Sequence, residues 1–377
     1  MRVAIDLTAL QPRATGVDTF LMEFVRHLAM IDGETQYTLF LNVADRRKFD
    51  WLTSGNFSLR TWSGRARPLR LVFQQVCLPL ASTLAGFDVI HSPAFLLPRL
   101  RGRARHLLTV HDMTFFTMPN VHNRLHRSAP FRRAVASSIR RADMVNVPSD
   151  ASRRDLLRLM PDVPDDKVRV TPWGIHPRFC PAPAAEIAEA VARLGLTQPY
   201  VLSLGTIEPR KNQLAILEAF RRFAAADNNG VHLVLAGGLG WNTRDVLREA
   251  ALPGLRDRIH VLGYVPADSL MWLYRGASIF AYPSIDEGFG FPPLEAMACG
   301  VPVIASCGSS LEENLGGAAQ LVPATDVSAL ADAMSELMLD STRRESLIRL
   351  GRERAATFRW EDTARRILKC YEDLAAS

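Results

Sequence analysis

Two glutamates, Glu287 and Glu295, stand eight positions apart in the stretch DEGFGFPPLEAMACG (286–300). Between them lie a Gly-Phe-Gly turn and two prolines, in a segment that is otherwise apolar. The preceding run IFAYPS (279–284) predicts a buried strand, so Glu287 lies just past the carboxyl end of that strand. In open parallel sheets, ligands bind at the carboxyl ends of the strands. The pattern therefore predicts carboxylates placed beside a ligand.

The turn between the glutamates suits such a site. Gly288 and Gly290 let backbone amides approach a ligand closely. The two prolines favour the start of a helix, with Glu295 in its first turn and Gly300 as its stop. Carboxylates accept hydrogen bonds from vicinal hydroxyls, as in a sugar or a ribose. Three other interpretations stay open: Glu295 complements the helix dipole, Glu287 is a cap or turn residue, or the pair is a hydrolytic acid and base, whose separation the sequence does not fix.

Two adjacent cations occur in SLGTIEPRKN (203–212). A strand is predicted to end at Gly205, and Asn212 is a favourable N-cap residue for the helix predicted over 212–224. Arg210 and Lys211 would then precede a helix N-terminus, whose free amides favour a dianion such as a pyrophosphate. The alternative is a surface turn with two solvated cations.

Two further residues follow predicted strands in the first half of the chain. His111 ends the run HLLTVHD (106–112), although a single histidine is more often structural than functional. Gly16 lies in RATGVDTFLMEF (13–24), before a helix predicted over 16–30, and an anion could bind there. That connection has no G-x-G-x-x-G pattern, so dinucleotide binding is not supported. The chain also has no Walker A loop, H-E-x-x-H, G-x-S-x-G or D-x-D, and we expect no metal.

Strands alternating with amphipathic helices predict the fold that must position these residues. Apolar runs predict strands in VAIDL, YTLFLN, DVIHS and HLLTVHD, and later in YVLSLGT, HLVLAGG, IHVLGYV, IFAYPS, PVIAS and AQLV. The proline-rich stretch 171–198 between the two series predicts an inter-domain border. The pattern is typical of two α/β domains, each with a mostly parallel sheet covered on both faces.

Composition indicates a globular protein of 377 residues, with 48% hydrophobic and 22% charged residues and no apolar run long enough to span a bilayer. The N-terminus enters a strand and lacks the features of a signal peptide. Five scattered cysteines without a C-x-x-C pattern suggest reduced thiols in a cytosolic protein. Between Arg60 and Arg158 there are 17 arginines, no lysine and five acidic residues. This is either a solvated basic face or a surface for an anionic partner, and a membrane surface ranks above nucleic acid because no nucleic-acid motif is present.

Together these stretches resemble the retaining glycosyltransferases of family 4, with their E-x7-E signature and GT-B fold. The resemblance lies in YPSIDEGFGFPPLEAMACGVPVIAS, GTIEPRKN, GYVPADSLMWLYRGASIF, VHD, VPSDASRRDL, PWGIHPRF and the closing FRWEDTARRILKCYEDL. It implies an α/β protein of two doubly wound Rossmann-like domains facing a central cleft. The implied divisions are an acceptor-binding domain over 1–178, a linker region over 179–198, a donor-binding domain over 199–359, and a helix over 360–377 that completes the first domain.

The resemblance also implies roles for single residues. Arg210 and Lys211 match the pair that binds the donor diphosphate, and Glu287 and His111 match residues that touch the transferred sugar. Glu295 matches the glutamate that holds the ribose hydroxyls. The remaining positions expected at the donor are Gly205, Gly288, Phe289, Gly290, Tyr264, Val265 and, in the first domain, Gly16. One departure is Asp18, because the first loop of many relatives reads Gly-Ile-Gly: Asp18 either points away, as a helix cap, or its loop serves the acceptor.

The implied reaction transfers a hexose with retention, without a metal or other cofactor. GTIEPRKN and GWNTRDVL look most like bacterial polysaccharide mannosyl- and rhamnosyltransferases, which favours GDP-mannose over a UDP- or dTDP-sugar. The expected acceptor is a glycan or a lipid-linked oligosaccharide, at the inner face of the cell membrane. Rival interpretations are an epimerase or phosphorylase of the same fold, and a non-catalytic nucleotide-sugar-binding regulator.

Overall fold

The computed structural model describes residues 1–12, 15–64, 66–100, 102–122, 127–226, 230–253 and 256–377. The chain divides into two compact units. Unit 1 holds Met1–Thr117, Arg124–Gly174 and Arg359–Ser377, and unit 2 holds Met118–Asn123 and Ile175–Phe358. The C-terminal segment Arg359–Ser377 thus lies in unit 1, and residues 175–178 lie in unit 2. The functional divisions stay predictions. The cleft between the domains stays a prediction.

Unit 1 is built on a seven-stranded sheet in the order β3-β2-β1-β4-β5-β6-β7, in which every pair is parallel. Its strands are β1 (Arg2–Asp6), β2 (Gln36–Asn42), β3 (Phe57–Trp62), β4 (Val89–Ser92), β5 (Arg105–Thr109), β6 (Met144–Val147) and β7 (Val168–Val170). The central strands are buried on both faces, as parallel strands covered by helices must be.

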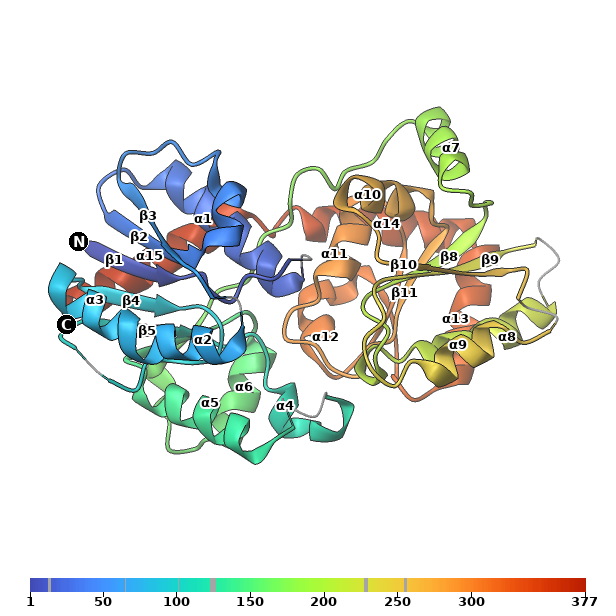
Figure 1. The fold of residues 1–377 in the computed structure, drawn as a ribbon. Coiled ribbons are helices and arrows are strands. Elements are labelled where there is room, and N and C mark those ends of the chain that lie inside the picture. Colours follow the sequence, from blue (N-terminus) through green and yellow to red (C-terminus); the bar gives the residue numbers. More distant parts are fainter. Residues whose placement is uncertain (13–14, 65, 101, 123–126, 227–229, 254–255) are drawn as a thin grey trace. The chain divides into compact units, whose positions relative to one another are not determined.

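Helices cover both faces of this sheet (Figure 1). They are α1 (Gly16–Ile31), α2 (Arg67–Val72), a π turn (Phe73–Cys77), α3 (Leu78–Ala85), α4 (Thr114–Thr117), α5 (Ala129–Arg141), α6 (Asp150–Leu159) and α15 (Trp360–Ala376). α1 confirms the helix predicted over 16–30, because the apolar positions at helical spacing, such as Phe20 and Phe24, are the buried ones.

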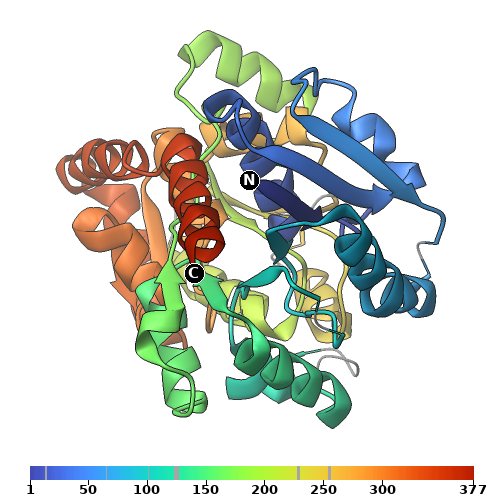
Figure 2. The same ribbon diagram turned by 90° about the vertical axis from the view of Figure 1, so that its left-hand side faces the viewer.

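The last helix, α15, packs against α1 and the sheet of unit 1. Tyr371 of α15 donates to or accepts from His91 of β4 across 2.7 Å, and its ring lies near that of Tyr37. Thr363 donates to the carbonyl of Pro172. The chain ends beside β5, where a guanidinium nitrogen of Arg105 lies 2.7 Å from the carbonyl of Ser377. Figure 2 marks this end of the chain at the tip of α15, which is drawn in red. Hydrogen bonds, of which the one between Tyr371 and His91 is buried, thus join α15 to the rest of unit 1.

Unit 2 has a six-stranded parallel sheet in the order β10-β9-β8-β11-β12-β13. Its strands are β8 (Tyr200–Leu204), β9 (His232–Ala236), β10 (Ile259–Gly263), β11 (Ile279–Tyr282), β12 (Val303–Ser306) and β13 (Gln320–Val322). Its helices are α7 (Ala184–Arg193), α8 (Gln213–Ala226), α9 (Arg244–Ala250), α10 (Ala267–Gly276), α11 (Phe291–Ala298), α12 (Ser310–Leu315), α13 (Val327–Leu339) and α14 (Ser341–Ala355). The strand order reverses direction at β8 and β11, and such a switch point is where open α/β sheets bind ligands.

All ten predicted strands are present, and both units have the doubly wound form expected. Three strands of unit 1 and the helical segment 67–85 were not predicted. β3 alternates exposed and half-buried residues at the edge of the sheet, and β6 and β7 are only four and three residues long. Among the described residues, no helix is long and apolar enough to cross a bilayer, and all five cysteines are free thiols.

Candidate active site

The carboxyl ends of β8 and β9 in unit 2 approach each other so closely that side chains are excluded. Gly205 directly follows β8 and donates its N–H to the carbonyl of Ala236. A Cβ on Gly237, which follows β9, would collide with the carbonyl oxygen of Gly205. Gly237 also has φ near 140°, which L-residues rarely adopt. The backbone therefore carries no side chains at Gly205 and Gly237, where open α/β sheets bind their ligands.

Arg210 and Lys211 lie next to this backbone and both contact Glu287. An Arg210 Nη atom lies 2.8 Å from Glu287 Oε2, and Lys211 Nζ lies 2.5 Å from Glu287 Oε1. Arg210 also pairs with Glu208 at 3.0 Å and donates to the carbonyl of Asp286. The structure thus joins residues from two loops that are 76 positions apart in the sequence.

Two hydroxyl groups complete the contacts of the Glu287 carboxylate. Ser284 donates to Oε1 at 2.6 Å, and Tyr282 donates to the same oxygen at 3.0 Å. Lys211 in turn lies 2.6 Å from the Tyr282 hydroxyl. Sequence reasoning missed Glu208, Tyr282 and Ser284. The signal that could have found Tyr282 and Ser284 is their place at the carboxyl end of the same predicted strand.

Burial and the neighbouring charges shift the pKa values of this cluster. Burial acts to raise the pKa of Glu287, but Arg210 and Lys211 outweigh it and hold that pKa well below its ordinary value. Burial and the neighbouring Arg210 guanidinium lower the pKa of Lys211, against the attraction of Glu287. Burial raises the pKa of Glu208. Two cations facing two carboxylates with little solvent access form an arrangement that an incoming dianion could enter by drawing the cations away from Glu287.

Asn212 stands at the N-cap position of α8 that the sequence predicted, and its carbonyl accepts from the N–H of Ile216, but its side-chain amide bonds elsewhere. Its backbone is left-handed, with φ of 59°, and α8 begins at Gln213. The Asn212 amide instead donates to the carbonyls of Pro283 and Ala324. Asn tolerates this conformation better than most residues. Its side chain therefore fixes the loop that carries the two cations to the loop that follows β11.

In the Gly-Phe-Gly turn before α11, Gly290 allows the backbone conformation and Phe289 anchors the turn in the core. Gly290 has φ of 92°, and a Cβ there would collide with Leu311, so only glycine fits. The Phe289 side chain is buried between the rings of Phe291 and Phe358, and its carbonyl accepts from an amide of Asn314. The contact expected from residues 288–290 can therefore come from the backbone but not from the Phe289 ring.

Glu295 lies further along α11 than the sequence predicted. The helix begins at Phe291, so Glu295 is its fifth residue and not part of its first turn, which weakens the helix-dipole interpretation. Its carboxylate accepts from the Tyr274 hydroxyl at 2.8 Å. Burial raises the pKa of Glu295 to about 7, against the opposing effects of that hydrogen bond and of the Arg178 charge. Near neutral pH this carboxyl is thus poised between its two forms.

Tyr264 and Val265 follow β10, two strands away from β8. Gly263 at the end of β10 accepts a hydrogen bond from Gly237. The Tyr264 side chain is 46% exposed. The carboxyl ends of β8, β9, β10 and β11 therefore form one edge, which carries Gly205, Tyr264 and the Glu287 cluster.

His111 lies two residues past β5 in unit 1. Its Nε2 lies 2.7 Å from the carbonyl of Pro93, so this nitrogen carries the proton. Its Nδ1 is buried and has no hydrogen-bond partner among the described residues. Burial lowers the pKa of His111 to about 4, so the imidazole is neutral and Nδ1 offers a lone pair. Such a group accepts a hydrogen bond from a hydroxyl and does not serve as an acid at neutral pH.

The question raised by Asp18 has a clear outcome. Asp18 is the N3 residue of a capping box on α1, in which it accepts from the backbone and hydroxyl of Thr15. Its other oxygen accepts from the N–H of Gln11. The carboxylate is buried in these bonds and serves as the cap. Gly16 is the first residue of α1, and its ligand contact stays a prediction. Residues 13–14 of the same connection lie outside the described residues.

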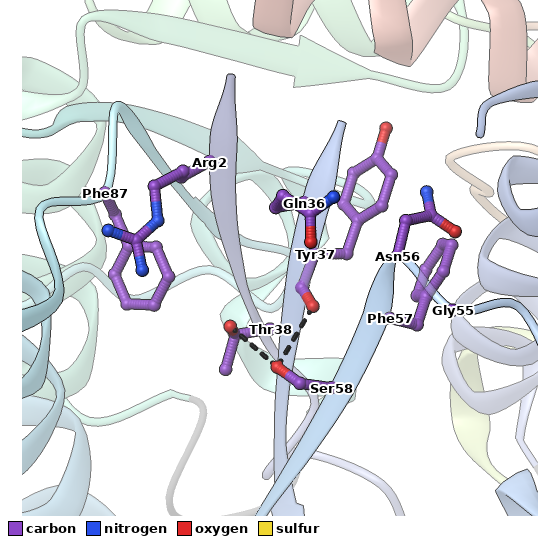
Figure 3. A pocket seen from close by; sticks show the side chains of 9 residues that line it. All are labelled: Arg2, Gln36, Tyr37, Thr38, Gly55, Asn56, Phe57, Ser58 and Phe87. Carbon is purple, nitrogen blue, oxygen red and sulfur yellow. Dashed lines mark hydrogen bonds between the residues drawn. The ribbon is translucent and has the colours of Figure 1, made fainter. Parts of the chain in front are cut away.

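One surface hollow of about 150 Å³ lies elsewhere in unit 1 (Figure 3). Arg2, Gln36 and Phe57, which line it, begin β1, β2 and β3, so the hollow is at the amino ends of the strands. Thr38 and Ser58 form a hydrogen bond within it. Ligands of open α/β sheets bind at the opposite edge, so we do not assign this hollow to the active site. Within the described ranges, no group of three His, Cys, Asp or Glu side chains is arranged to hold a metal ion.

Known proteins resemble this chain in sequence over nearly its whole length. Residues 186–354 match the family model "Glycosyl transferases group 1", and residues 14–179 match "Glycosyltransferase Family 4". The O-antigen chain mannosyltransferase B of Escherichia coli is 30% identical, over 99% of this chain and 100% of that protein. A D-inositol 3-phosphate glycosyltransferase of Salinispora tropica is 28% identical, over 96% of this chain and 82% of that protein.

Solved structures share the fold at lower identity. A sucrose-phosphate synthase from Thermosynechococcus elongatus superposes with a TM-score of 0.80 at 23% identity, covering all of both chains. The lipopolysaccharide glycosyltransferase WaaG gives 0.75 at 15% identity, again over both whole chains. Anabaena HepE, solved with UDP-glucose, gives 0.77 at 16% identity over 99% of this chain and 100% of that one. The chain is therefore a glycosyltransferase of the GT-B fold and belongs to the family of the Escherichia coli O-antigen chain mannosyltransferase.

Proposed function

We propose that this glycosyltransferase moves mannose, with retention, from GDP-mannose to a glycan or lipid-linked oligosaccharide in bacterial polysaccharide synthesis. Support for mannose comes from the Escherichia coli relatives, which are named O-antigen chain mannosyltransferase and serotype-specific mannosyltransferase. Support for a nucleotide-sugar donor comes from fold neighbours solved with UDP and UDP-glucose. A UDP- or dTDP-sugar is the alternative donor.

The observation that carries this proposal is the meeting of Arg210 and Lys211 with Glu287 at the carboxyl edge of the sheet. Departure of a nucleoside diphosphate builds negative charge on its phosphates. Two preorganised cations in a site with little solvent stabilise that charge. Glu287 holds the cations in place before the donor arrives and then orients a sugar hydroxyl. The donor phosphate itself takes the acceptor proton, so neither glutamate is a nucleophile and no metal is required.

Other side chains would position the donor. Glu295 accepts hydrogen bonds from the ribose hydroxyls, and the buried Tyr274 hydroxyl orients its carboxylate. The exposed Tyr264 and the adjacent Val265 contact the nucleobase. The neutral His111 accepts a hydrogen bond from a hydroxyl of the transferred sugar. The backbone of Gly16 contributes a minor contact to the donor.

We further propose that the enzyme works in the cytoplasm at the inner face of the cell membrane, where a lipid-linked acceptor would be. The support is the excess of arginine between Arg60 and Arg158. Three of the 17 arginines, Arg65, Arg101 and Arg124, lie outside the described residues. Nucleic acid is not an expected partner.

The testing experiment measures binding and slow hydrolysis of GDP-mannose, UDP-glucose and dTDP-rhamnose by the purified protein, with and without EDTA. We expect selective hydrolysis of GDP-mannose at a rate that EDTA does not change. Equal rates for all three would contradict the donor assignment. Loss of turnover with EDTA would contradict the metal-independent mechanism, and binding without turnover in the presence of acceptor glycans would favour a non-catalytic binding protein.

A further inference from the structure

Unit 1 carries an apolar stripe on the outward face of the helical segment 67–85, which joins α2, the π turn and α3. The stripe consists of Leu69, Val72, Val76, Leu80 and Leu84, which are 44% to 89% exposed. Leu100, 57% exposed, lies in the segment that runs beside this helix. Six of the fifteen large apolar side chains exposed in the described residues therefore lie within this part of the chain. Scattered exposed leucines are normal, but a contiguous stripe needs an explanation.

The opposite face of the same helix is already occupied. Phe73 and Leu78 pack on Phe40 and Ile90 of the sheet. Gln74 is buried and donates to Asp6 and to the carbonyl of Leu96. The helix is thus apolar on both faces, and packing in the core cannot explain the outward leucines. A surface helix with one buried face normally has a polar face toward water.

The π turn keeps the stripe narrow. Leu78 bonds back to the carbonyl of Phe73, five residues earlier, so one residue is accommodated in a widened turn. Successive residues of an α-helix are rotated by about 100° around the helix axis. With the extra residue taken up in the π turn, the five stripe side chains spread over about 80° around this axis, against about 120° on an uninterrupted α-helix. The irregular turn therefore aligns the two halves of the stripe.

Basic residues flank the stripe and acids are missing. Gln75 of the helix accepts from the N–H of Arg99 and donates to the carbonyl of Leu97, which holds the 97–100 segment alongside. A Cβ on Gly102 would lie 3.1 Å from Thr83 of α3, so the exposed Arg103 follows at the same surface. From residue 51 to 111 the sequence has eight arginines and one acid, Asp88. The Asp88 carboxylate accepts the N–H of Arg2.

We propose that this surface, defined as the stripe with Leu100, Arg99 and Arg103, docks on an anionic lipid bilayer. An apolar helical face flanked by arginine suits the boundary between headgroups and acyl chains. A second copy of the chain fits less well, because a two-fold interface would set these arginines against each other, and Asp88, the single acid of residues 51–111, already accepts from the N–H of Arg2. This surface would be the membrane contact of the proposed function. The docking itself is argued from the surface alone, and the proposed function supplies only the reason for it.

The test is sedimentation with vesicles of phosphatidylcholine alone or mixed equally with phosphatidylglycerol, at 50 and 300 mM salt. Wild type should bind the anionic vesicles at low salt and bind the neutral ones at least tenfold more weakly. L80Q with L84Q should weaken binding at least tenfold, while L339Q, a change at a 79%-exposed leucine of unit 2, should leave it unchanged. R99Q with R103Q should weaken it about tenfold or more.

R132Q with R133Q on α5 is the matched charge control, because it removes the same charge from the same unit where no exposed apolar residue accompanies it among the described residues. An equal loss in that variant would overturn the proposal in favour of diffuse attraction. Binding unaffected by L80Q with L84Q would also overturn it, as would a wild-type dimer that this pair makes monomeric. Hydrolysis of GDP-mannose in solution should be the same in wild type and L80Q with L84Q. If vesicle binding follows the expected pattern but no sugar nucleotide is turned over, the proposed function fails and the docking surface stands.

Discussion

The two Rossmann-like units carry very different groups at the carboxyl ends of their strands. In unit 2 this edge holds a buried cluster of opposite charges, with Arg210 and Lys211 against Glu287. In unit 1 the buried groups at this edge include the neutral imidazoles of His91 and His111. Exposed arginines lie on the outside of unit 1: some pair with acids, as Arg140 does with Asp162, and others flank the apolar stripe. Under the proposed function, one fold therefore serves two purposes: unit 2 would bind a dianion, whereas unit 1 would bind uncharged hydroxyls and an anionic surface.

The largest expected effect comes from removing a cation of unit 2. Lys211→Ala leaves Arg210 alone to stabilise the departing diphosphate, and we expect turnover to fall by about 10²–10³-fold, as when one oxyanion donor is lost. Initial rates with GDP-mannose and a purified acceptor glycan would measure this. Lys369→Ala, on an exposed lysine of α15, is the control and should be neutral. Near-normal transfer by Lys211→Ala would exclude the phosphate assignment.

A smaller effect, with a distinctive signature, is expected at Glu287. Glu287→Gln keeps the shape but removes the charge that pairs both cations, so transfer should fall about 10–100-fold because the sugar is no longer oriented. GDP itself should bind as tightly as before or more tightly, because the cations no longer have to leave a carboxylate. Calorimetric titration with GDP beside steady-state kinetics would separate the two effects. Weaker GDP binding together with unchanged transfer would contradict this division of roles.

The comparison also shows where sequence reasoning succeeds. Helix α1 was predicted because its apolar residues recur at helical spacing, and the strands of unit 2 were predicted because they are short apolar runs. The helical segment 67–85 was missed because it is apolar on both faces and contains Pro79, so no single face stands out. The spacing of Glu287 and Glu295 located the candidate site. The pairing of Glu287 with Lys211 could not be predicted, since it depends on two loops brought together only by the order of β8 and β11.

The sequence predicted the helix that carries Glu295 but not the surroundings of its carboxylate. The two prolines correctly indicated a helix, but the sequence did not show that the helix starts at Phe291 or that Tyr274 supplies a hydroxyl from α10. Burial of the carboxyl, and hence its raised pKa, depends on packing between helices. Local pattern therefore finds the residue, whereas tertiary structure sets its chemistry.

That raised pKa predicts a pH effect on donor binding. With a pKa of about 7, Glu295 is largely protonated at pH 6 and offers fewer acceptor sites to ribose hydroxyls. The affinity for GDP should therefore fall by up to about tenfold per pH unit below 7 and level off above it. Calorimetry at pH 6.0, 7.0 and 8.0 would show this, with Glu295→Gln as the variant whose affinity is lower at pH 8.0 and does not follow the same curve. Identical pH profiles for wild type and Glu295→Gln would contradict the ribose assignment.

The smallest effect contrasts the two units through their stability. Burial lowers the pKa of His91 in the folded protein to about 3, whereas the same imidazole in the unfolded chain has its ordinary pKa of 6.5. Below pH 6.5 the unfolded chain therefore binds a proton that the folded protein does not bind, and the free energy of unfolding decreases as the pH falls. Between pH 7.5 and 5.5 this costs unit 1 about 1 kcal/mol relative to His91→Gln. Glu295 acts with the opposite sign, because its raised pKa makes the folded state the better proton binder, and the same acidification should stabilise unit 2 by about 2 kcal/mol relative to Glu295→Gln. Hydrogen exchange of peptides from β4 and α11 in each variant would report the two units separately. If acidification changed the stability of both units in the same direction, the opposite pKa shifts of His91 and Glu295 would be contradicted.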